Sequence, residues 1–180
     1  MELRLPLAQY GSQLWTRERA RDIAGRLADL LRQLEPGGVA VIDLKTVEVF
    51  DFSFANELFG KTLLALPTEY PGRFLVVEHL TTYTRENLER ALESLNLAMI
   101  ERKGRQLSLL GKLHPADRET FGVLAAARAP VTAAALKEQL GINLTAVNER
   151  LAKLVRLALV RREHAISAAG REQYEYRVLT

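Results

Sequence analysis

The sequence of 180 residues predicts an α/β protein, in which a layered α/β domain is followed by a small α+β domain. Over residues 1–103, short apolar runs of strand length alternate with longer segments whose apolar residues recur every three or four positions. Over residues 116–180, two helical segments joined by a short turn precede two alternating strands. Residues 104–115 form the predicted linker, which contains a short strand-like run from Gln106 to Leu110, followed by Gly111 and Pro115.

The first domain is predicted to alternate three strands with three helices. Residues 2–7 alternate apolar and polar side chains, which is the period of a strand with one solvated face. Thr16 is expected to cap a helix that runs to about residue 34, because its apolar residues form one stripe. The other predicted elements are a buried strand at 39–44, a helix from Ser53 to Leu66, a strand at 73–77, and a helix that Thr84 caps and whose apolar stripe runs from Leu88 to Met99.

The stretch over residues 43–58 passes from a buried strand to a helix through an acidic, hydroxyl-bearing turn. We expect the Ser53 hydroxyl to accept a hydrogen bond from the Asn56 amide and so to cap the helix. The pattern Asp43-Leu44-x-x-Val47-x-x-Phe50-Asp51-x-Ser53 resembles the signature of STAS domains, the fold of anti-sigma-factor antagonists. More narrowly, Thr16-Arg17-x-x-Ala20 together with Ser53-Phe54-Ala55-Asn56-Glu57-Leu58 resembles the uncharacterised STAS-like group.

The resemblance implies that the first domain binds a protein partner, for instance an anti-sigma-type ATPase, or dimerises. In phosphoregulated STAS proteins the signature is Asp-Ser-Ser-Gly, and its first serine takes the phosphate. Here Phe52 stands at that serine and Phe54 at the glycine, so a constitutive docking surface or an interdomain contact is favoured. Phosphorylation of Ser53, which matches the second serine, and a simple helix-capping role are the alternatives. The candidate residues of this site are Asp51, Phe52, Ser53 and Phe54.

The second domain is predicted to be a helix-turn-helix unit with a β-hairpin. A helix over 117–128 precedes a short helix over 132–140, the turn Gly141-Ile142-Asn143 and a longer helix ending near Ala158. Two alternating strands, 159–166 and 171–179, then flank a tip of small residues. This order resembles the winged helix-turn-helix domain of bacterial repressors of the MarR and ArsR type, which implies binding to double-stranded DNA.

In that interpretation the longer helix enters the major groove. Asn148 suits a bidentate contact with adenine, and Thr145 suits a phosphate or a thymine methyl group. Glu149 lies in the middle of the same face, four residues before a lysine, so an internal ion pair is the alternative use of that face. The residues expected to meet phosphates are Lys153, Arg156, Arg161, Arg162 and Arg171.

The charge distribution favours an anionic partner for the second domain only. Residues 1–116 carry 15 basic and 15 acidic side chains, whereas residues 117–180 carry 10 basic and 7 acidic ones, which accounts for the net charge of +3. This excess is small for a monomer that binds DNA. We therefore expect a two-fold homodimer that presents two such domains.

The sequence predicts binding rather than catalysis. It has no cysteine, no glycine-rich phosphate loop and no run of about 18 apolar residues, so we expect a cytoplasmic protein that has no cofactor and does not associate with a membrane. Its three histidines lie in separate segments, which predicts no metal site. The leading hypothesis is a DNA-binding transcriptional regulator. The alternative is a protein-interaction adaptor that does not bind DNA and takes part in partner switching.

Overall fold

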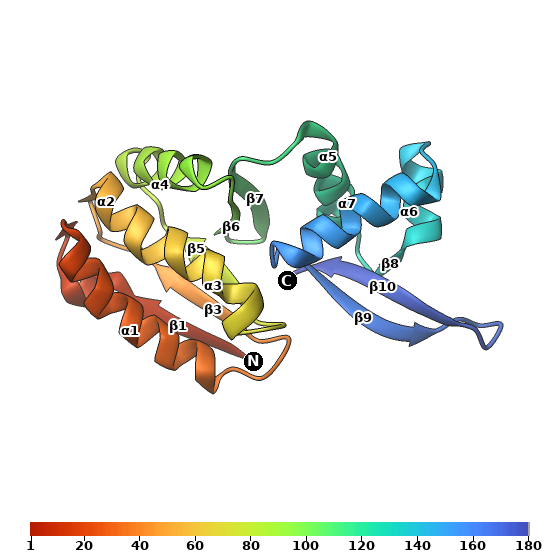
Figure 1. Cartoon of the computed structure of the whole chain (residues 1–180), viewed down its shortest axis with the longest axis horizontal. Helices are drawn as coiled ribbons and strands as arrows, with labels where there is room; N and C mark the ends of the chain where they lie inside the picture. Colours follow the sequence, from red (N-terminus) through yellow and green to blue (C-terminus); the bar gives the residue numbers. More distant parts are fainter. Residues whose placement is uncertain (180) are drawn as a thin grey trace. The chain divides into compact units, whose positions relative to one another are not determined.

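The structure is a computed structural model that describes residues 1–179. The chain forms two compact units (Figure 1): unit 1 spans Met1–Lys112, and unit 2 begins at Leu113. The predicted α/β fold class is confirmed, because unit 1 is built on a largely parallel sheet with helices packed against it. Among the described residues, no helix is both long enough and apolar enough to span a membrane.

The sheet of unit 1 has five strands in the order β1-β3-β5-β6-β7. They are β1 (Glu2–Pro6), β3 (Val39–Asp43), β5 (Phe74–Glu78), β6 (Ala98–Lys103) and β7 (Gln106–Gly111). The first four are parallel, and β7 returns antiparallel to β6 through a turn at Gly104. The registers place Leu5 beside Ile42, Ile42 beside Val77 and Val77 beside Glu101, so these side chains share one face of the sheet.

The helices of unit 1 lie on one face of this sheet, since each right-handed crossover leads to the next strand in the same direction. Figure 1 shows α1, α3 and α4 on the same side of the strands. The helical elements are α1 (Arg17–Gln33), α2 (Phe52–Ala55), the π-helical η2 (Asn56–Gly60), α3 (Lys61–Glu69) and α4 (Thr82–Ser94). A 3-10 turn, η1 (Leu7–Tyr10), and a small parallel pair of strands, β2 (Gln13–Leu14) and β4 (Val49–Phe50), complete the unit.

Two helix starts differ from the prediction. Asp51, rather than Ser53, caps α2, because its carboxylate accepts the Phe54 amide at 2.6 Å. Thr81 caps α4, and Thr84 is the residue at the third helical position that completes the capping box. In both places two residues that can cap a helix lie close together in the sequence, and the helix begins after the earlier one.

The third strand–helix repeat ends earlier than predicted. Asn96, with a φ of 53°, lies just beyond α4, and Met99 belongs to β6 instead of the helical stripe. The strand-like run predicted from Gln106 to Leu110 is the strand β7, which pairs with β6, so the sheet of unit 1 extends into the segment predicted as a linker. The apolar residues of β6 continue the helical spacing of α4 by chance, so the sequence pattern does not reveal where the helix ends and β6 begins.

Unit 2 consists of three helices and a three-stranded sheet in the order β8-β10-β9. Its elements are α5 (Pro115–Ala126), β8 (Val131–Thr132), α6 (Ala133–Leu140), α7 (Leu144–Arg156), β9 (Val160–Ile166) and β10 (Glu172–Val178). Phe121, Leu136 and Leu151 are buried between the helices, and Tyr176 and Val178 are buried on the sheet. The short strand β8, in a segment expected to be a break, pairs with β10 at Val131 and Thr132.

Candidate nucleic-acid interface

The long helix α7 is positioned by a glycine turn and an asparagine cap. Gly141 ends α6 in the left-handed conformation, with a φ of 64°, where a side chain on the backbone is unfavourable. Asn143 then caps α7 by accepting the Ala146 amide at 2.8 Å. Val147, Leu151 and Leu154 are fully buried, so the rotation of α7 about its axis is set by its packing against α5 and α6.

The opposite face of α7 projects into solvent. Thr145 and Asn148 stand in its first two turns, and Arg156 stands in its last turn. Glu149 is also exposed and lies beside Asn148, so this face carries one acid among its polar groups. The exposed residues of the face are Thr145, Asn148, Glu149, Ala152 and Arg156. Their contact with DNA remains a prediction.

Lys153 is engaged within the unit. Its Nζ lies 2.6 Å from Oδ2 of Asp117, a buried acid in the first turn of α5. Arg150 likewise donates to the Ala116 carbonyl at 3.2 Å and pairs with Glu119 at 3.3 Å. These contacts join α7 to α5. Lys153 therefore holds the two helices together. It pairs with Asp117 of α5, and not with Glu149 of its own helix, which was the alternative that the sequence offered.

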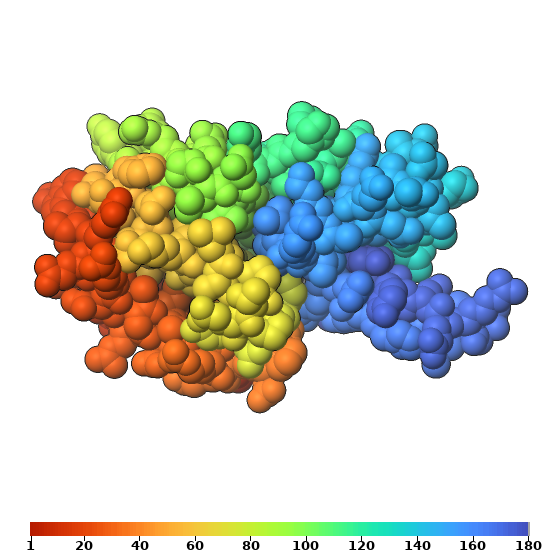
Figure 2. Space-filling view, in the orientation of Figure 1, coloured from red at the N-terminus to blue at the C-terminus, as the bar shows by residue number. Residues whose placement is uncertain are grey.

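The hairpin of β9 and β10, called the wing below, extends beyond the helices of its own unit (Figure 2). On one face the Arg162 guanidinium lies 4.6 Å from the centre of the Tyr174 ring. The His164 ring meets the same tyrosine edge-on, with the ring centres 5.9 Å apart. Arg171 is exposed just after the tip, where its amide hydrogen-bonds to the Ser167 hydroxyl at 3.0 Å. Arg162 and Arg171 are thus exposed cations on the wing.

Arg161 lies on the other face of the wing, together with acidic groups. Its guanidinium is 3.8 Å from Glu163, and Arg177 lies 2.6 Å from the same carboxylate. Burial and the neighbouring Arg177 lower the pKa of the Arg161 guanidinium. Because Glu163 offsets part of the positive charge of this face, we expect Arg161 to contribute less to phosphate binding than Arg162 or Arg171.

In unit 1, only part of the predicted docking surface is exposed. Phe52 and Ser53 are half-buried at the start of α2, and Asp51 is occupied as its cap. Phe54 is fully buried, with its ring 5.7 Å from that of Phe50. Phe54 is therefore a core residue and is not available to a partner, which corrects its inclusion in the predicted docking site.

An ionic network that the sequence pattern does not predict lies near the carboxyl ends of the strands. Glu78 accepts hydrogen bonds from Arg4 at 2.7 Å and from Arg102 at 2.5 Å, and so links β1 to β6. Next to it, Nδ1 of His79 lies 2.7 Å from Oδ1 of Asp43. The residues described hold no group of three or more acidic, histidine or cysteine side chains suited to a metal ion. The signal in the sequence is the acidic residue that ends each of two buried strands, Asp43 in β3 and Glu78 in β5.

Comparisons with known proteins do not assign the chain to a family. No family model matches it, and no curated protein matches it. One solved structure, a "possible transcriptional regulator" from Methanosarcina mazei Go1, is similar over 38% of this chain and 57% of that chain, with 19% sequence identity and a TM-score of 0.35. A TM-score of this size carries no argument about the present chain, so the STAS-like and winged-helix interpretations remain predictions.

Proposed function

We propose that the protein is a transcriptional regulator whose unit 2 binds double-stranded DNA. The observation that carries the proposal is the geometry of α7, which is held by its buried face and presents Thr145, Asn148 and Arg156 to solvent. A helix held in this way, after a short glycine turn, matches the recognition helix of a winged helix-turn-helix domain. The proposed role is binding, with no catalytic step.

The proposal gives separate roles to the exposed side chains of unit 2. Asn148 reads a base edge in the major groove, and Thr145 contacts a phosphate or a thymine methyl group. Arg156, Arg162 and Arg171 neutralise phosphates and fix the orientation of the unit on the duplex. Since unit 2 carries a small net positive charge, two copies in a homodimer are needed to supply enough phosphate contacts.

Unit 1 supplies the dimer contact or a protein docking site in this proposal. The exposed side chains of Trp15 and Tyr83 (44% and 67% exposed) offer apolar area, and Phe52 adds a half-buried ring. Replacing Phe52 by Ser tests whether the start of α2 takes part. We expect the variant to lower dimerisation or partner capture, as measured by light scattering and pull-down. Unchanged association would leave that turn as part of the core only.

The test of DNA binding is a salt series with duplex DNA of arbitrary sequence. The logarithm of the binding constant is expected to fall with the logarithm of salt concentration by about 0.9 for each phosphate neutralised. Arg162→Ala and Arg171→Ala are each expected to reduce that slope by about one unit. Arg26→Ala, which removes an exposed cation from unit 1, is the matched control and should leave the slope unchanged.

Salt-independent binding, or no binding at low ionic strength, would overturn the proposal. Recovery of a protein partner without nucleic acid would then favour the alternative, an adaptor whose two units both contact proteins. A further check uses Glu149→Gln, which removes the one acid from the exposed face of α7. If that face meets DNA, this variant binds more tightly than the wild type.

A further inference from the structure

Glu149 points almost directly away from the core of unit 2. It follows the buried Val147 by two residues and precedes the buried Leu151 by two. Two residues correspond to a rotation of about 200° around a helix axis, so Glu149 lies opposite to both. Its side chain is exposed. Any surface that meets this face of α7 therefore meets the Glu149 carboxylate.

The cations closest to Glu149 along α7 are turned toward α5. The guanidinium of Arg150 pairs with Glu119 at 3.3 Å. Nζ of Lys153 lies 2.6 Å from Oδ2 of Asp117. Among the described residues, no ion pair includes Glu149. The exposed face of α7 thus carries a negative charge that its own helix does not neutralise.

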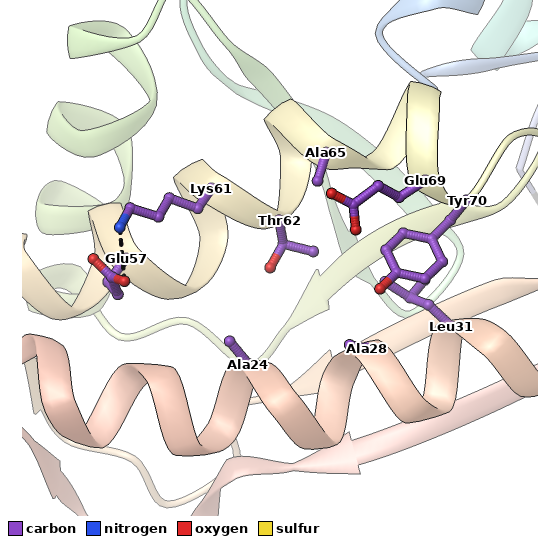
Figure 3. Close-up of a pocket in the computed structure, with 9 residues that line it drawn as sticks. All are labelled: Ala24, Ala28, Leu31, Glu57, Lys61, Thr62, Ala65, Glu69 and Tyr70. Atoms are coloured by element: carbon purple, nitrogen blue, oxygen red, sulfur yellow. Dashed lines mark hydrogen bonds and ion pairs between the residues drawn. The ribbon is translucent and has the colours of Figure 1, made fainter.

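The spacing of Glu149 and Lys153 allows an ion pair, because a glutamate and a lysine four residues apart on a helix are neighbours. Glu57 and Lys61 in unit 1 form such a pair, in which Nζ of the lysine donates to Oε1 of the glutamate at 2.8 Å (Figure 3). On α7 the lysine contacts the buried Asp117 instead. A buried acid loses more than an exposed one when its partner leaves, so Lys153 stays with Asp117.

An uncompensated carboxylate at this position restricts the bases that α7 can meet in a major groove. Guanine and thymine present acceptors there, and these repel a carboxylate. The donors are the amino groups of adenine and cytosine. The adenine amino group stands beside the N7 acceptor, whereas cytosine presents its amino group alone. Because a carboxylate that loses water without gaining a donor is unfavourable, cytosine is the base that suits Glu149 best.

The other residues of the exposed face fit close contact with bases. Ala152 has a short side chain, which lets the helix approach the groove floor. Asn148 stands next to Glu149, and its amide can accept from the adenine amino group while it donates to N7. Arg156 lies about 10 Å farther along the axis, at a place suited to a phosphate. Asn148 and Glu149 are therefore expected to contact neighbouring base pairs.

We propose that α7 selects duplex DNA in which an A·T and a C·G base pair are adjacent, with the Glu149 carboxylate accepting a hydrogen bond from the cytosine amino group. This assignment rests on the proposed function, because it requires α7 to enter the major groove. Glu149 is then a specificity-determining residue, which weakens binding wherever it finds no donor. The exposed cations Arg156, Arg162 and Arg171 supply the binding that does not depend on sequence.

The test begins with selection, by the full-length protein, from a pool of duplexes whose central base pairs are random. We expect the retained duplexes to share adjacent A·T and C·G pairs. Replacing that C·G pair by T·A puts the O4 acceptor of thymine opposite the carboxylate. This change should weaken the binding of the wild-type protein about tenfold, as measured by fluorescence anisotropy.

Three variants assign the preference to its residue. Glu149→Gln should bind the two duplexes within about twofold of each other, because its amide can donate as well as accept. The same variant should bind duplexes of arbitrary sequence more tightly than the wild type. Asn148→Ala should lose the preference for adenine and keep the preference for cytosine. Glu138→Gln, which removes an exposed acid from α6, is the matched control and should keep both preferences.

The inference fails, while DNA binding stands, if salt-dependent binding is observed but the retained duplexes show no preference for cytosine. It also fails if Glu149→Gln keeps the preference of the wild type. If the wild type binds no duplex at low ionic strength, the inference and the proposed function fail together, and the exposed face of α7 would instead contact a protein.

Discussion

In unit 1 the carboxylate of Glu101 is fully buried and forms hydrogen bonds with the Arg85 guanidinium, whereas in unit 2 Arg156 and Arg171 extend into solvent. Unit 1 has as many acids as bases and uses several of them inside the fold. Glu78 and Arg102, for example, connect its strands. Unit 2 carries the whole positive excess and leaves much of it exposed. The comparison teaches that a region without net charge can still depend on ion pairs for its stability, while a weakly basic region leaves several of its cations exposed to solvent.

The largest effect is expected from Arg85→Met, which keeps the aliphatic stem but leaves Glu101 buried without its main partner. Breaking a buried ion pair from one side costs about 3–5 kcal/mol. The change in the free energy of unfolding can be followed in urea through the fluorescence of Trp15, the one tryptophan of the chain, which reports on unit 1.

The matched control for that variant is Glu138→Ala in unit 2, whose side chain is 77% exposed and pairs with Lys137. Its expected cost is below about 0.5 kcal/mol, measured by circular dichroism because Trp15 does not report on unit 2. Equal losses of unfolding free energy in the two variants would contradict the comparison, because the buried ion pair of unit 1 would then contribute no more to stability than an exposed pair of unit 2.

A smaller and gradual loss of stability is expected in acid. At Glu101, burial raises the pKa, but the hydrogen bond and charge of Arg85 outweigh it, and the pKa is lowered. At Glu78, burial is likewise outweighed by Arg4 and Arg102. A lowered pKa in the folded state gives stability above the unfolded value of about 4.3, and this stability is lost as the pH falls through the folded value.

Urea unfolding of unit 1, repeated from pH 7 downward, checks this expectation. The free energy of unfolding should be constant above about pH 5 and should decrease below it. A value that stays constant through pH 3 to 4 would mean that these carboxylates are not paired in solution.

The smallest effects distinguish Lys153 from Arg156 on α7. Lys153→Met removes the contact with Asp117 and is expected to cost about 1 kcal/mol of stability, because the lysine is partly exposed. Arg156→Ala is expected to leave stability within about 0.5 kcal/mol and to reduce the salt slope of DNA binding by about one unit. If both variants weaken DNA binding equally, Lys153 exchanges its partner when DNA is present.

The elements that the sequence predicts well are those with a long periodic pattern. The helix over Arg17–Gln33 and the helix over Leu144–Arg156 each carry one apolar stripe, and that stripe is buried in the structure. Short elements are harder to predict. The strand β8 has two residues, and β6 follows α4 so closely that Met99 continues the apparent stripe of the helix. In these places tertiary pairing decides the conformation.

The candidate sites follow the same division. The outward direction of Thr145, Asn148 and Arg156 could be predicted from a rotation of 100° per residue, because it depends on one helix only. The burial of Phe54 and the pairing of Lys153 with Asp117 depend on elements far away in the chain. The buried carboxylate of Glu57 lies in the π-helical turn η2, for which the sequence has no recognisable signature.

The strand order of unit 1 also bears on how the chain is synthesised. Each strand of the main sheet pairs with the one that precedes it in that sheet, from β1 through β3, β5 and β6 to β7. A chain that leaves the ribosome from its amino end can therefore add each strand to an edge that already exists. Only the antiparallel pairing of β6 with β7 is local, and the parallel pairings, which each bridge a whole crossover, are expected to form more slowly. We expect unit 1 to be complete before the helices of unit 2 have been made.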